Sequence, residues 1–188
     1  MQSREDATIE RSRVVQAQFT GSTLSRLRLT DVVIEGCDLS GTDLDEASVT
    51  RVEFRDCRMS GAMFTRSSLR DVLFAGCRLD DANFRMSDTK SVVFEDVDLR
   101  RSDFYAAHVD GTRFFDCDLT GAEFTKASAP GARFHGSTLL DLKGGQYLAG
   151  AVIESSQVLP VALGVLAALH IGVDDEREPL DAVTRRDR

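Results

Sequence analysis

Residues 54–74 read FRDCRMSGAMFTRSSLRDVLF, and every fifth position of this stretch, beginning with Phe54, carries an apolar side chain. The same spacing continues in both directions without a change of phase and covers 25 consecutive positions, of which Thr89 alone is polar. The full series is Phe19, Leu24, Leu29, Ile34, Leu39, Leu44, Val49, Phe54, Met59, Phe64, Leu69, Phe74, Leu79, Phe84, Thr89, Phe94, Leu99, Phe104, Val109, Phe114, Leu119, Phe124, Ala129, Phe134 and Leu139.

A five-residue period fits neither of the common regular structures. Five residues turn about 140° around an α-helix, and in a flat strand they alternate between the two faces, so this apolar series would be scattered into water. If the chain instead turns a corner of about 90° after each pentapeptide, a coil closes after about 20 residues and every fifth side chain points to a shared axis. The spacing therefore predicts a square solenoid.

A second set of positions supports the same winding. In a short extended segment the residue two places before an inward residue shares its face, close to a corner where little room is available. From Ala17 to Ser137 these positions hold only Ala, Ser, Thr, Cys or Val, apart from Leu27. We expect the four cysteines, which all belong to this set, to be buried and reduced.

Individual units of the chain carry a family motif. Residues 37–41 read Cys-Asp-Leu-Ser-Gly, residues 42–46 read Thr-Asp-Leu-Asp-Glu, and residues 122–126 read Ala-Glu-Phe-Thr-Lys. With its units in phase, the chain resembles the pentapeptide repeat proteins, whose unit is of the A-[DN]-L-x-x type. The resemblance implies an all-β fold, a right-handed quadrilateral β-helix, which we expect over residues 1–154 with the repeats clearest over 17–141.

A helix is expected after the repeats. The regular spacing fails at Gly144, and Ser155 or Ser156 can cap a mostly apolar helix that stops at Gly172. We therefore predict a C-terminal α-helix over 155–173, which caps the last coil.

The predicted helix is apolar nearly all round, which indicates contacts on two sides. A twofold homodimer is the simplest source of the second contact, and a purely structural cap without a dimer is the alternative. The charged tail over 174–188 is expected to be disordered. The predicted dimerisation residues are Leu159, Leu163, Leu166, Leu169 and Ile171.

Composition limits the kinds of partner. The formal charge is −8, from 31 acidic and 23 basic side chains, which argues against direct contact with nucleic acid and permits a basic protein surface as partner. The N-terminal residues lack the apolar segment of a signal peptide, and no stretch reads as a membrane span. We expect a cytoplasmic protein that does not bind membranes.

The sequence offers no recognisable catalytic or cofactor site. His108, His135 and His170 lie far apart, and none has a further ligand at metal-binding spacing. The glycines of the repeats fall two places after inward residues, where a corner requires them, so they do not indicate a phosphate-binding loop. No serine stands in a nucleophile motif. We expect a protein that is not an enzyme and has no metal and no cofactor.

Acidic side chains gather on one side when the sequence is projected onto four walls. They define a predicted acidic edge for binding a partner, although a solenoid also needs surface charge to stay soluble, and that alternative remains open. The predicted edge consists of Asp56, Glu95, Asp96, Asp98, Asp103, Asp116, Asp118 and Glu123.

Within the family, the chain is most similar to the quinolone-resistance proteins of the Qnr and MfpA type. That resemblance implies a dimeric acidic rod that mimics DNA, binds DNA gyrase or topoisomerase IV, and modulates the enzyme or protects it from quinolones and other poisons. The repeats here contain no inserted loops, which favours the MfpA type. The alternative is a non-catalytic interaction scaffold with an unrelated cytoplasmic partner.

Overall fold

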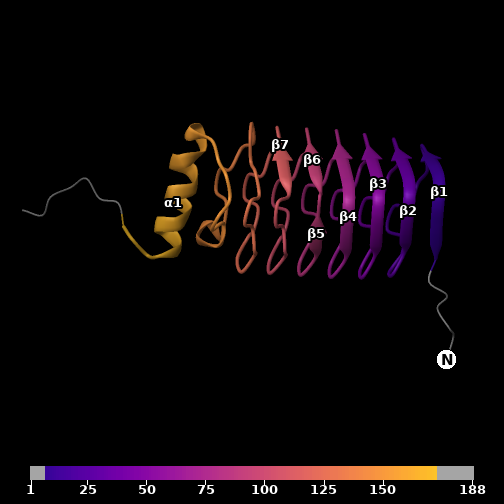
Figure 1. Ribbon diagram of the computed structural model, residues 1–188, viewed down its shortest axis with the longest axis horizontal. Coiled ribbons are helices and arrows are strands. Elements are labelled where there is room, and N and C mark those ends of the chain that lie inside the picture. The colour runs from indigo at the N-terminus through magenta and orange to yellow at the C-terminus, as the bar shows by residue number, and fades with distance from the viewer. Residues whose placement is uncertain (1–6, 173–188) are drawn as a thin grey trace, which may run out of the picture.

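The computed structural model describes residues 7–172, and Figure 1 shows a straight column of stacked coils with one helix at its end. Coil follows coil in chain order along the column. The right-handed quadrilateral β-helix with a C-terminal helix is thus confirmed. Its strands are β1 (Thr8–Val15), β2 (Arg28–Glu35), β3 (Ser48–Arg55), β4 (Ser68–Ala75), β5 (Asp88–Lys90), β6 (Val93–Glu95) and β7 (Arg113–Phe115).

Equivalent residues of successive coils lie 20 positions apart. The strands form a parallel sheet in the order β1-β2-β3-β4-β6-β7, with β5 beside β4. The longer strands turn a corner in their middle, so β5 continues one wall from β4 and β6 continues the next wall. Thr8 pairs with Arg28 at the start of this sheet, and the same step still joins Arg113 to Arg133. Each coil therefore satisfies its backbone groups through the next coil, which is how a solenoid without a globular core is held together.

Phenylalanine rings fill the axis in two parallel stacks. In the stack that contains Phe94, successive rings lie 4.8–5.1 Å apart. In the stack that contains Phe104, the same separation is 4.8–5.0 Å. Rings of the two stacks meet edge to face at 5.8–6.5 Å, a favourable aromatic arrangement. Large aromatic side chains therefore line two walls of the apolar core.

The one polar member of the inward series is satisfied inside the core. Thr89 is buried, and its hydroxyl donates to the carbonyl oxygen of His108 at 3.0 Å. It also lies 2.6 Å from the hydroxyl of Thr112. Because a buried hydroxyl costs free energy only when it lacks a partner, the column tolerates this polar side chain.

The cysteines are buried at the small inward positions, as expected, and form no disulfide. Their thiols donate to backbone carbonyls of the preceding coil, as Cys77 does to Phe54 at 3.4 Å and Cys117 does to Phe94 at 3.5 Å. Burial raises the pKa of Cys117 to about 12. These thiols pack as small, unreactive core groups.

The corners of the coil need an unusual backbone conformation. The residue two places after an inward residue has positive φ, as at Gly41 (62°), Arg51 (52°) and Asp96 (53°). Glycine takes this conformation without penalty, whereas other L-residues lose about 1–2 kcal/mol. Corner glycines therefore have the conformational role that the sequence predicted for them.

The winding changes at the C-terminal end of the column. Arg133 pairs with Val152, so this step is one residue shorter than the others. Gly144 stands where the next inward side chain would be, and a Cβ atom there would lie 2.3 Å from the backbone nitrogen of Thr125. Only glycine fits this close approach. A 3-10 turn, η1 (Gly145–Tyr147), follows it and leads the chain across the end of the column.

The C-terminal helix consists of η2 (Ser155–Gln157) and α1 (Val158–Ala168). The predicted serine cap is wrong: Glu154 is the N-cap residue, and its backbone N–H donates to the side chain of Gln157 at 2.8 Å. Gln157 is buried and also donates to carbonyls of the last coil, so it fastens the helix start to the column. His170, with a φ of 54°, adopts the left-handed conformation near the helix end that was expected of Gly172. The predicted tail, 174–188, lies outside the described residues.

Replacing Phe94 by Ala tests the stacked core. The ring contacts its neighbours above, below and across the axis, so its removal should leave a cavity and lower the free energy of unfolding by roughly 3–5 kcal/mol. Denaturant unfolding measures this, with the exposed Met63→Ala as control. An unchanged midpoint for Phe94→Ala would contradict the fold described here.

Candidate functional site

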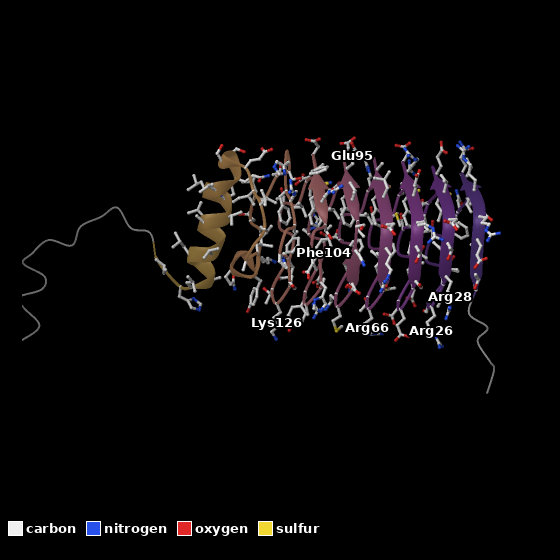
Figure 2. The ribbon with its side chains drawn as sticks, viewed as in Figure 1. Arg26, Arg28, Arg66, Glu95, Phe104 and Lys126 are labelled. Carbon is white, nitrogen blue, oxygen red and sulfur yellow. The ribbon has the colours of Figure 1, made fainter. Side chains whose placement is uncertain are left out.

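The predicted acidic edge begins at the corner that follows the β3–β4–β6–β7 wall. Glu95 ends β6, Asp96 follows it, and Asp116 follows β7 one coil further on. Figure 2 shows Glu95 along one edge of the column, with Arg26, Arg66 and Lys126 along the opposite edge. The column thus presents an acidic side chain at one corner and basic side chains at the corner across from it.

Backbone geometry contributes to the choice of aspartate at this corner. Asp56, Asp96 and Asp116 have φ of 52°, 53° and 54°. Aspartate enters the left-handed region more readily than most residues, because its short carboxylate can interact with the local backbone. The stacking of these three residues on one corner therefore has a structural cause as well as any functional one.

Four of the predicted edge residues have a structural role. Asp98, Asp103, Asp118 and Glu123 each stand directly before an inward residue and accept the N–H of the residue after it, at 3.2, 2.8, 3.0 and 2.7 Å. These bonds close local turns. The second position of the repeat unit, where an acidic or amide side chain recurs, is the signal in the sequence that marks this role, although the spacing alone does not reveal the bond.

Arginine side chains neutralise part of the edge. Arg100 pairs with Asp98 at 2.6 Å and approaches Asp118 to 3.9 Å. The hydrogen bond from Arg100 lowers the pKa of Asp98, against the opposing effect of partial burial. On another wall, Arg85 pairs with Asp103 at 2.8 Å. The potential of these carboxylates is therefore reduced within the molecule itself.

The remaining carboxylates are free within residues 7–172. Asp56, Glu95, Asp96 and Asp116 make no hydrogen bond or ion pair through their side chains with any residue of that range. Glu95, Asp96 and Asp116 lie together, and we call these three the free acidic corner.

The structure groups the predicted edge residues differently from the sequence. A shallow groove beside the free acidic corner is lined by Asp96, Asp98, Asp116 and Asp118 together with Arg78 and Arg100. Asp56 lines a separate groove with Asp38 and Arg58. Asp103 and Glu123 lie on a different wall, where their backbones form a β-bridge between successive coils. The eight predicted residues therefore form three groups.

The helix α1 has an inner face and an outer face. On the inner face, Gly164 approaches the last coil so closely that a Cβ atom would lie 2.8 Å from the carbonyl oxygen of Leu142. On the outer face Leu159 is 66% exposed and Ile171, just beyond the helix, is 50% exposed. Leu163 and Leu169 are also exposed, whereas Leu166 is half-buried. Four of the five predicted dimerisation residues thus lie on an uncovered apolar surface.

The described part of the chain has neither a metal-binding cluster nor a membrane-spanning helix. No group of three or more His, Cys, Asp or Glu side chains in it is arranged to hold a metal ion. No helix in the same part combines the length and the hydropathy needed to span a membrane.

Comparison with known proteins identifies the repeats. A family model described as a pentapeptide repeat region matches residues 7–84 and 67–143. The structure is similar to that of trypsin-treated QnrB1, a plasmid-mediated fluoroquinolone resistance protein, with a TM-score of 0.60 and 18% identity over 93% of this chain and 94% of that chain. HetL, involved in heterocyst differentiation regulation in the cyanobacterium Nostoc, matches with a TM-score of 0.30 and 18% identity over 80% and 90% of the two chains. No curated protein sequence matches. At this identity the likeness to QnrB1 shows the fold alone.

The two kinds of carboxylate should differ in their effect on stability. Asp118→Ala removes an acceptor of the Thr120 N–H and hydroxyl, and should lower the free energy of unfolding by about 0.5–1.5 kcal/mol. Asp118→Asn keeps an oxygen acceptor and should lose less. Glu95→Ala, from the free acidic corner, should change stability by less than about 0.5 kcal/mol. Equal stability of Asp118→Ala and the unmodified protein in denaturant unfolding would show that the turn bond contributes nothing.

Proposed function

The chain belongs to the pentapeptide repeat family, and from that premise we propose that it binds DNA gyrase or topoisomerase IV in the cytoplasm as a non-catalytic mimic of DNA. The observation that carries the proposal is the free acidic corner, Glu95, Asp96 and Asp116, on the side of a straight column. Carboxylates that have no internal partner are available to the cations of a DNA-binding channel.

Rigidity supports this function. The inward series runs without interruption, and stacked rings fill the axis, so the column keeps its shape when it enters a channel. A preformed surface avoids the cost of ordering that a flexible acidic segment would have. Complementary potential also steers the encounter between an acidic rod and a basic channel. By occupying the site of a DNA segment, the protein would modulate the enzyme or protect it from quinolones and other poisons.

A twofold homodimer through the outer face of α1 forms part of the proposal. Leu159, Leu163, Leu169 and Ile171 supply an apolar surface at the end of the column, where contact with a second copy would bury it. Such a dimer would double the length of the rod and leave the acidic corner of each copy exposed.

An interaction scaffold with an unrelated cytoplasmic partner is the second candidate. The observation that favours it is the internal neutralisation of the edge, where Arg100 and Arg85 pair with acidic neighbours. A DNA mimic gains from carboxylates that stay unpaired, so each internal ion pair weakens the electrostatic argument.

Neutralising the free acidic corner tests the mimic. The triple variant Glu95→Gln, Asp96→Asn and Asp116→Asn should bind purified gyrase about tenfold more weakly at low salt, if each carboxylate contributes roughly 0.5 kcal/mol. Its affinity should also fall less steeply as salt is raised, because fewer ion pairs are formed. The measurements are equilibrium binding across a salt series and DNA supercoiling by gyrase with and without a fluoroquinolone.

Glu46→Gln is the matched control, because Glu46 is also a left-handed corner carboxylate but lies on the corner across the column. It should leave binding and supercoiling unchanged. If the unmodified protein neither binds gyrase nor changes supercoiling or quinolone sensitivity, the mimic is rejected and the scaffold remains.

Placing charges on the outer face of α1 tests the dimer. The double variant Leu159→Glu and Leu163→Glu should sediment as a monomer at micromolar concentration, because it buries carboxylates in the proposed interface. Met86→Glu introduces a charge at an exposed apolar side chain on the column and should leave the dimer intact. A monomer for the unmodified protein would leave α1 as a cap only.

A further inference from the structure

One wall of the column carries apolar side chains on its outer surface. Phe74, Phe94 and Phe114 of this wall point inward and are buried, so the residues that alternate with them in β4, β6 and β7 point outward. Successive coils bring four of these outward residues together. They are Leu73, Ala75, Val93 and Phe115, which we call the apolar wall patch.

The members of the patch are neighbours through strand pairing. Leu73 lies opposite Val93 in the register between β4 and β6. Ala75 lies opposite Glu95, and Glu95 lies opposite Phe115 on the next coil. All four apolar side chains are half-buried by their neighbours, among which Arg113 lies opposite Val93 and the His135 ring meets the Phe115 ring edge to face at 6.1 Å. No further segment of the described chain lies over this wall.

The other walls differ at the same height. From residue 68 to residue 127, the outward positions of the other three walls hold charged or polar side chains, and Tyr105 is the one that carries a six-membered aromatic ring, while His108 carries an imidazole. That ring lies under Arg85 at 4.2 Å and near Lys126, so it is already occupied. Among the outward wall positions of these coils, contiguous apolar side chains are therefore confined to one wall, while Met86 and Ala106 stand one coil apart at a corner elsewhere.

The free acidic corner borders this patch. Glu95 lies between Ala75 and Phe115, and Asp96 and Asp116 follow at the corner. An apolar centre with a charged rim is the usual anatomy of a protein interface. The carboxylates would repel a nucleic acid or an anionic lipid surface and attract a protein that carries cations around an apolar side chain.

We propose that the apolar wall patch is the centre of the contact with gyrase or topoisomerase IV, and that the free acidic corner is its rim. This inference rests on the proposed function and deepens it. It divides the binding into two parts: the rim gives attraction that salt weakens, and the patch gives apolar burial that salt does not screen. A surface that only imitated duplex DNA would have the first part alone.

The test is the affinity of purified gyrase for Phe115→Ser across a salt series. Affinity should fall about tenfold or more at every salt concentration, and the slope of log affinity against log salt should stay that of the unmodified protein. Leu73→Gln should act in the same way. Neutralising Glu95, Asp96 and Asp116 should instead reduce the slope.

Met63→Ser is the matched control, because Met63 is exposed and apolar but lies on the wall across the column. It should bind gyrase as the unmodified protein does. Thermal melting of every variant shows whether the column is intact, and Leu73→Gln keeps the test valid if Phe115→Ser unfolds.

Three results would overturn the inference, and they can be told apart. If folded Phe115→Ser and Leu73→Gln bind as tightly as the unmodified protein while the triple acidic variant binds more weakly, the patch is not part of the contact and the mimic stands. If the unmodified protein does not bind, both proposals fail. If Phe115→Ser changes the sedimentation of the protein alone, the wall joins copies of this chain instead.

Discussion

The inward stack of side chains is the interaction on which the rest of the structure depends, because a single coil has no core of its own. Rings of successive coils stack 4.8–5.1 Å apart, close to the separation of about 4.8 Å that strand pairing requires. One winding therefore satisfies the backbone hydrogen bonds and the aromatic contacts together. A slip of one residue would bring outward and corner residues into the axis, so the register is fixed along the column.

The left-handed backbone at the corners has a conformational cost that this packing has to offset. The same corners explain part of the acidic composition of the molecule. Many corner residues other than glycine have positive φ, and Asp is frequent among them, with examples at Asp31, Asp71 and Asp81. A second group of carboxylates closes turns before the inward residues, as Asp43 does for the N–H of Asp45. Part of the negative charge thus follows from the geometry of the coil. Acidic residues without either role, such as Glu95, are more informative about a partner.

The inward positions could be predicted from sequence because the problem is one-dimensional: each coil repeats the last, and a spacing of five already places Phe94 or Phe104 inside. The end of the column breaks this repeat. Gly144 and the cap at Glu154 depend on contacts with the last coil, which the periodicity does not contain.

The acidic edge was predictable as columns of charge but not as a site. Projection onto four walls places Asp96 above Asp116, yet it does not show that Arg100 pairs with Asp98 or that Asp118 is bound by its own turn. Those contacts depend on side-chain conformation. The apolar outward residues were visible in the same projection, with Leu73 and Val93 one coil apart and Ala75 and Phe115 on either side of Glu95. A single Leu or Val on a surface nevertheless has no meaning until strand pairing makes it contiguous with others.

Charge density sets a limit on how far the column can act as DNA. Duplex DNA carries about one charge per 1.7 Å, whereas carboxylates on successive coils are about 4.8 Å apart even where they are adjacent. Electrostatic attraction to a channel is correspondingly weaker, so a tight complex needs a further source of free energy, and apolar burial on the neighbouring wall is one. The outer face of α1 lies at the end of the column, while the acidic corner runs along its side. Because the two surfaces do not overlap, self-association and partner binding need not compete.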